Sequence, residues 1–259
     1  LAPWSALPAN DAGDEYLLER YNIRLVISGR DLVAKPDQRK TTAPVILANP
    51  DFDQQESQKK SAIKGIFKTL PPESENATRS FSAQSTLPKV QSLPNTGIEA
   101  LAIQPHIEIY TKQKAGLYKE QYALERVAKV LRSPQIVTFA THGFFLPTQE
   151  TKLDDRNLAM GDDTRSVALD TNGQQIENPL LRCGLLLSGC NNREASVADD
   201  DGILTGMEIV SIDLRGTELV VLSACETGIG EVKNGEGVAG LRQAFQLAGA
   251  EAVVATLWQ

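Results

Sequence analysis

The chain has 259 residues, of which 41% are hydrophobic, and carries a formal net charge of −7. That length and apolar content suffice for one sizeable core. The acidic balance argues against a nucleic-acid partner, because a sequence-independent grip on phosphates needs an excess of Lys and Arg. No apolar stretch approaches the roughly 20 residues that cross a bilayer, so we expect no membrane partner.

The N-terminus and the cysteines bear on where the protein resides. Residues 1–5 lack a basic flank followed by an apolar core, which predicts no signal peptide. The chain lacks an initiator Met, and we expect it to be a fragment truncated at both ends. An odd count of three cysteines, Cys183, Cys190 and Cys225, fits a reducing cytoplasm. None has metal-ligand spacing, so we expect no metal and no other cofactor, with Cys183 and Cys190 in the core.

The first third of the chain predicts two strands and a polar insertion. Residues 21–28 alternate like a half-buried strand, and 45–48 are a short apolar run. Residues 51–96 are polar and form the predicted insertion, with one short amphipathic helix around Ile63. Its lysines indicate a solvated face, with an anion site as the alternative: Lys59, Lys60, Lys64 and Lys68.

Alternating elements follow from residue 97. We expect a helical turn at 98–103, a strand at 107–110 and an amphipathic helix at 118–132, ended by Ser133-Pro134. His106, just before the second of these, is expected to be structural. A second polar insertion spans 148–178. The remaining predictions are strands at 136–142, 182–188, 219–222 and 252–257, a turn at 199–202, and helices at 205–209, capped by Thr205, and 235–247, ended by Gly249. Apolar strands that alternate with helices predict an α/β fold with a mostly parallel central sheet covered on both faces.

Two of these strands are predicted to end in residues that can do chemistry. The run Leu219–Leu222 leads to Cys225, and the run from Ile136 leads to His142. Carboxyl ends of parallel strands meet at one edge of a sheet, so the thiol and the imidazole can be neighbours. An imidazole can take the thiol proton and later give it to a leaving amine. The backbone amides of Gly143 and Cys225 are the candidate oxyanion donors, and a glycine lets a carbonyl approach closely.

A structural role without catalysis stays open for each of these residues. A lone Cys at a strand end is usually a small buried hydrophobe, and a lone His a bystander. Glu226 either lines a substrate pocket or holds its loop. Acidic loop residues, among them Asp154, Asp155, Asp201 and Glu226, favour a basic substrate residue or are simply solvated. The glycines at 228–237 do not have the spacing of a dinucleotide fingerprint, which disfavours a nucleotide-binding domain.

The chain resembles the CHAT domain, a caspase-like peptidase domain often attached to tetratricopeptide repeats in bacteria. Residues 140–144 (Ala-Thr-His-Gly-Phe) are similar to its His element, and residues 222–228 (Leu-Ser-Ala-Cys-Glu-Thr-Gly) to its Cys element. Further similar segments are residues 1–7, 48–52, 93–100, 201–205, 237–250 and 257–258. The family pattern continues beyond residue 259, and the insertion at 51–96 is longer and more polar than is usual there.

The resemblance implies one domain over residues 1–259 with a caspase-like three-layer sandwich. It also implies a cysteine endopeptidase that uses Cys225 and His142 on a protein substrate, regulated by a partner protein or by attached repeats. A catalytically silent module that acts as a signalling or peptide-binding scaffold is the alternative.

Overall fold

The computed structural model describes residues 7–10, 12–21, 23, 39–67, 87–146, 178–195, 200–226 and 236–256. These residues belong to two compact units, Leu1–Asp37 and Gln38–Gln259. In the first unit, α1 (Leu17–Arg20) begins after Tyr16, whose backbone N–H donates to the Glu19 carboxylate at 2.7 Å. The strand predicted at 21–28 lies largely outside the described residues.

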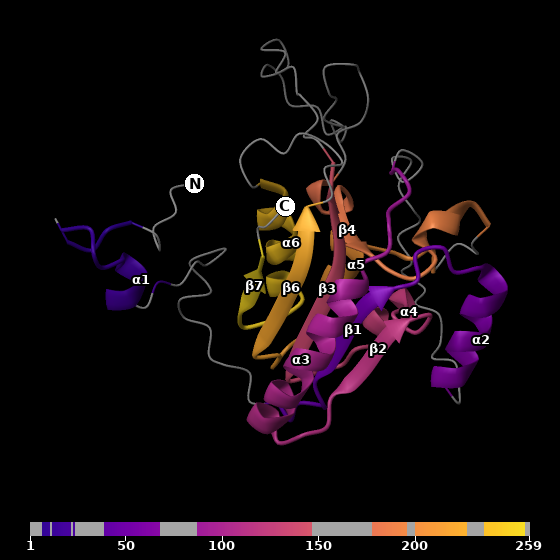
Figure 1. The fold of residues 1–259 in the computed structure, drawn as a ribbon, viewed down its shortest axis with the longest axis horizontal. Coiled ribbons are helices and arrows are strands. Elements are labelled where there is room, and N and C mark those ends of the chain that lie inside the picture. Colours follow the sequence, from indigo (N-terminus) through magenta and orange to yellow (C-terminus); the bar gives the residue numbers. More distant parts are fainter. Residues whose placement is uncertain are drawn as a thin grey trace, which may run out of the picture. The chain divides into compact units, whose positions relative to one another are not determined.

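The second unit is built on one sheet (Figure 1). Its described strands number seven: β1 (Val45–Pro50), β2 (Gly116–Glu120), β3 (Ile136–Phe145), β4 (Cys183–Leu186), β5 (Ile203–Thr205), β6 (Leu219–Glu226) and β7 (Val253–Ala255). The helices are α2 (Glu56–Ile66), α3 (Pro94–Thr111), α4 (Glu125–Lys129), α5 (Gly206–Val210) and α6 (Glu236–Leu247), with the short 3-10 turns Pro179–Leu181 and Cys190–Ala195. The predicted α/β fold with a mostly parallel sheet is confirmed, and it is consistent with a caspase-like sandwich.

Strand β3 is the hub of the sheet. It pairs in parallel with β1 on one edge and with β6 on the other, so that five parallel strands run in the order β2, β1, β3, β6, β7. Beyond the end of β1, residues His142–Phe145 pair with β4 in antiparallel fashion, and β4 pairs with β5. Because β4 extends this pairing, β3 continues three residues past His142. The prediction that the strand ends at His142 is therefore wrong.

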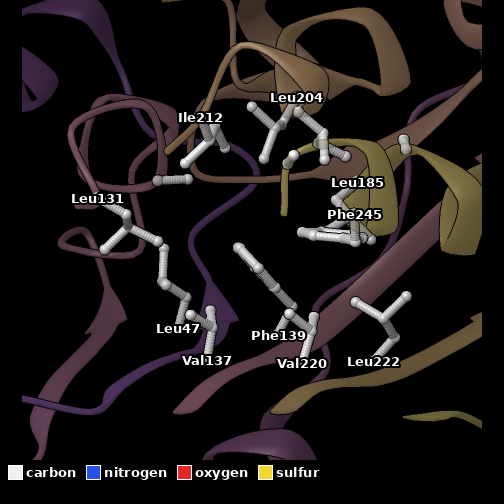
Figure 2. Packing of buried hydrophobic residues seen from close by; sticks show 14 of the residues in the cluster. Leu47, Leu131, Val137, Phe139, Leu185, Leu204, Ile212, Val220, Leu222 and Phe245 are labelled. Carbon is white, nitrogen blue, oxygen red and sulfur yellow. The ribbon is translucent and has the colours of Figure 1, made fainter. Parts of the chain in front are cut away.

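Helices cover both faces of the sheet. Ala100, Ile103 and Ile107 of α3 pack on Ile46, Ala48 and Ala140, and α3 lies in front of the strands in Figure 1. On the opposite face, Phe245 of α6 packs on Phe139, with ring centroids 5.5 Å apart. Figure 2 shows this second layer, where Leu47, Val137, Val220 and Leu222 of three strands line one side of the core and Phe245 lies on the other. Burying each such side chain stabilises the fold by about 1.5–3 kcal/mol.

Two predicted elements have a different structure. Residues 107–110 are the end of α3 and not a strand, because Ala100, Ile103 and Ile107 lie on one helical face and are drawn onto the sheet. Pro105 is tolerated within this helix on its exposed side. The helix predicted at 118–132 is β2 followed by the short α4; Leu124, Val127, Ala128 and Leu131 are buried as expected, but only α4 is helical.

Other predictions agree closely with the structure. α2, α5, α6 and the strands at 45, 182, 219 and 252 lie within a few residues of their expected bounds. Thr205 caps α5 by accepting from the Glu208 backbone N–H. Cys183 and Cys190 are buried. Lys59 is a correction: it is 3% exposed, and its Nζ donates to the Asp200 carbonyl at 2.5 Å, so it belongs to no solvated face.

Within the described ranges, no helix is both long and apolar enough to cross a membrane.

Candidate functional site

The candidate site lies at the carboxyl ends of β1, β3 and β6. The connection after β1 includes α3 on one face of the sheet, whereas α4, which precedes β3, packs into the core of the other face. The helical connections next to β1 and β3 therefore lie on opposite faces of the sheet, which makes the gap between these strands a topological switch point. Crevices outside the carboxyl ends of strands at such a switch point are where open α/β sheets bind ligands.

His142 and Cys225 are register partners on neighbouring parallel strands. Adjacent strands lie about 4.8 Å apart, so the backbones of these two residues are side by side although 83 positions separate them in the chain. Ser223 and Ala140 form the preceding pair on the same face, because residues two apart along a strand share a face. The sheet thus brings together the two residues that the sequence singled out.

Hydrogen bonding fixes the orientation and tautomer of the His142 imidazole. Its Nε2 lies 3.0 Å from the backbone carbonyl oxygen of Gln91. A carbonyl oxygen can only accept, so Nε2 carries the proton and donates it. Nδ1 of a neutral ring is then the acceptor, and this buried atom has no hydrogen-bond partner among the described residues. The ring therefore presents a lone pair at Nδ1.

Packing sets the electrostatics of the ring. The Phe52 ring, just past β1, lies against His142 with centroids 5.3 Å apart. Burial lowers the pKa of His142, and the hydrogen bond to Gln91 partly offsets that shift. Phe52 also contacts Phe144, Leu186 and Ile203 in a small apolar cluster, which fixes its position. The half-buried imidazole is consequently held in place by its contacts, and the lowered pKa favours its neutral form.

Gly143 lies inside β3, with Leu185 and Glu226 as register partners on its two sides. A Cβ atom at Gly143 would lie 3.7 Å from Ala224 Cβ and from the Gly184 carbonyl oxygen, which is ordinary contact. Residue 143 faces the side of the sheet opposite to His142. The missing Cβ therefore does not open the His142 side, and the role of the Gly143 amide as an oxyanion donor stays a prediction.

The predicted acidic residues are not gathered around His142. Asp201 lies in the turn before β5, where its Oδ1 accepts from the Ile203 backbone N–H at 2.9 Å. His142 pairs with Leu186 of β4, and Leu186 pairs with Ile203 of β5. Asp201, just before β5, is therefore on the opposite side of β3 from Cys225. Glu226 ends β6 beside Gly143. Asp154, Asp155 and most of the insertion at 148–178 are outside the described residues.

Asp201 instead borders a buried charged cluster. Glu125, which is 1% exposed, accepts from the Gly202 backbone N–H at 2.8 Å and contacts Lys129, which also lies 2.8 Å from Glu208. Burial raises the pKa of Asp201 to about 6 and raises that of Glu125 well above its usual range. No group of three His, Cys, Asp or Glu side chains in the described part of the chain is arranged to hold a metal ion.

Two components of the site were not predicted as such. The Gln91 carbonyl is a backbone atom in a polar segment, and any residue there supplies one, so the sequence carries no signal for it. Phe52 was noted only within the segment 48–52. Its contact with His142 depends on the pairing of β1 with β3, which residue periodicity does not specify.

Comparison with known proteins is consistent with this geometry. A search of curated proteins finds no match. The model of the CHAT domain family matches residues 1–259, the whole chain. The chain therefore belongs to the CHAT domain family, which is related to the caspase-like peptidases.

Proposed function

We propose that this protein is a cysteine endopeptidase in which Cys225 is the nucleophile and His142 the general base and acid. The observation that carries the proposal is the register of His142 with Cys225 on β3 and β6. Nδ1 of the His142 imidazole has no hydrogen-bond partner among the described residues and can act as an acceptor. Membership in a family related to caspase-like peptidases supports the same chemistry. The substrate is a protein, and the chain resides in the cytoplasm.

The first half of the reaction forms an acyl-enzyme. Nδ1 of His142 takes the proton of the Cys225 thiol, and the sulfur attacks the scissile carbonyl carbon. The electron pair moves onto the carbonyl oxygen, where the amides of Gly143 and Cys225 hold the oxyanion. When the oxyanion collapses, the C–N bond breaks, and the departing amine receives the proton from Nδ1.

The second half releases the acid. A water gives a proton to Nδ1 and attacks the thioester carbon, and collapse of the second oxyanion expels the Cys225 sulfur. The Gln91 carbonyl supports each step, because it keeps the proton on Nε2 and so leaves Nδ1 free to exchange the reacting proton.

Mapping of new protein N-termini tests the proposal. The chain, and its parent protein where the chain is a part, is incubated with cell lysate as wild type and as Cys225→Ala and His142→Ala. His106→Ala is the matched control, since it removes the other of the two histidines from an exposed position on α3. We expect new N-termini with wild type and His106→Ala alone. Identical termini in all four samples would leave the scaffold interpretation standing.

Regulation is part of the proposal. A partner protein or attached tetratricopeptide repeats would control access of the substrate to Cys225. The lysate experiment therefore includes the parent protein, in which attached repeats would be retained.

A further inference from the structure

A carboxylate with no part in the mechanism above is bound to β6, the strand that carries the candidate nucleophile. Glu99, near the start of α3, accepts a hydrogen bond through Oε2 from the Ser223 hydroxyl of β6 at 2.9 Å. Both side chains are partly exposed. Among the described residues, Glu99 has no ion-pair partner. Within the described part of the chain, this carboxylate is thus held in place by a neutral hydroxyl and not by a cation.

Ser223 places that charge relative to Cys225. The two residues are two positions apart on β6, so they share a face of the sheet and their Cα atoms are about 7 Å apart. Their register partners on β3, Ala140 and His142, lie on the same face, and α3 packs over Ala140. The Glu99 carboxylate therefore lies on the reacting side of the sheet, within reach of a long side chain from a substrate bound at Cys225.

The negative charge of Glu99 opposes ionisation of the Cys225 thiol, and a basic substrate can remove that opposition. A carboxylate near a thiol disfavours the thiolate, because like charges repel. Anchoring α3 to Ser223 does not require the charge, since the amide oxygen of a glutamine would accept the same hydrogen bond. A guanidinium or ammonium group beside Glu99 would neutralise it through charge-assisted hydrogen bonds, and arginine offers two parallel donors.

We propose that Glu99 determines specificity by binding a Lys or Arg side chain of the substrate next to the scissile bond. The inference rests on the proposed function, because it takes Cys225 as the point where the substrate is held. Glu99 is not among the acidic loop residues suggested from the sequence, and its role would make the site specific for basic peptides.

Peptide binding to the Cys225→Ala chain tests Glu99 independently of turnover. Three fluorescent peptides identical except for Arg, Gln or Glu at one central position are titrated by fluorescence polarisation, and the Arg and Gln peptides are the pair compared. We expect the Arg peptide to bind at least tenfold more tightly. Adding Glu99→Gln should reduce that ratio to about one, and adding Glu99→Lys should invert the preference toward a Glu peptide.

Two further variants separate specificity from anchoring. Ser223→Ala removes the hydrogen bond but leaves the carboxylate, so it should keep the preference for Arg. Glu108→Gln changes another carboxylate of α3, which accepts from Gln104 and from the Ala115 N–H and not from β6, and should also keep it. Circular dichroism confirms that each variant is folded.

Each outcome decides one proposal. Equal binding of both peptides, binding of neither, or an Arg preference that survives Glu99→Gln overturns the role of Glu99. Cleavage of the Arg peptide by the Cys225-containing chain is measured in parallel. An Arg preference without any cleavage would remove the peptidase proposal and keep Glu99 as a binding determinant. Cleavage without an Arg preference would support the peptidase proposal and overturn the role of Glu99.

Discussion

The ring of Phe52 lies against the imidazole of His142 with centroids 5.3 Å apart, and this contact links the end of β1 to the middle of the candidate site on β3. It covers part of a base whose pKa is lowered by burial. A base with a lowered pKa keeps its neutral, proton-accepting form to lower pH, so we expect His142 to titrate below 6.5, the usual value.

The Phe52→Ala variant tests the cause of that shift. Removing the ring lets water reach the imidazole, and the pKa of His142 should rise toward 6.5. NMR titration of the imidazole Cε1–H signals measures both values, with His106→Ala to assign the two histidines. Titration of wild-type His142 at or above 6.5 would contradict the burial argument.

Glu125 gives a stability prediction. Its carboxylate holds the Gly202 amide and Lys129 while 1% exposed. Glu125→Ala leaves the Gly202 amide without that acceptor, while Lys129 keeps Glu208, and should cost about 1–3 kcal/mol of unfolding free energy. Glu125→Gln keeps an oxygen for the Gly202 amide and should cost less. Urea denaturation measures the free energies, and equal losses in the two variants would show that the Gly202 contact contributes nothing.

Asp201 should destabilise the protein at neutral pH. Its pKa is about 6 in the folded state against 3.8 ordinarily. Between these values the folded state binds more protons than the unfolded state, so stability falls as pH rises through that window. Asp201→Asn keeps an acceptor for the Ile203 amide and should be more stable by about 1–2 kcal/mol at pH 7.5, with little difference at pH 3.5. Thermal melts at the two pH values check this, and a gain of equal size at both would refute the linkage.

Two glycines, one within α6 and one in the turn after it, should respond to alanine in opposite directions. Gly249 has φ +111°, and a Cβ there would lie 2.8 Å from the Arg215 backbone nitrogen, so Gly249→Ala should destabilise by about 1–3 kcal/mol. Gly240 lies within the helix, and its Cβ would meet only Cys183 Sγ at 3.6 Å. Gly240→Ala should be neutral or stabilising by up to about 1 kcal/mol. Chemical denaturation measures the free energy of unfolding of both variants. A destabilised Gly240→Ala would show that α6 has no room for a methyl group at residue 240.

Local patterns were enough to predict the strands that carry the site. The apolar runs before His142 and Cys225 are buried parallel strands, and their order along the chain limits the topologies. Which residue lies opposite which was beyond local patterns, because register is set by packing across the whole sheet. The β-branched run at Ile107 and Ile109 predicted a strand, yet Ile107 packs against Ala48 and Ala140 as part of a helical face, and Ile109 is exposed.

The reactive side chains of the site could be predicted from the sequence, but the contacts that orient them could not. A thiol, an imidazole and their strands are visible as side chains and periodicity. The carbonyl of Gln91 is invisible in a sequence, because every residue has one. The contact between Glu99 and Ser223 joins positions 124 residues apart, and nothing in either local segment indicates the other.

The reactivity of Cys225 tests the pairing with His142 most directly. Cys183 and Cys190 are buried, and burial raises the pKa of Cys183 to about 12, so alkylation with iodoacetamide should report on Cys225. Mass spectrometry follows the rate of Cys225 modification at pH 6.5 in wild type, His142→Ala and His106→Ala. We predict at least a tenfold slower reaction in His142→Ala and an unchanged rate in His106→Ala. Equal rates in all three proteins would contradict the assignment of His142 as the base of Cys225.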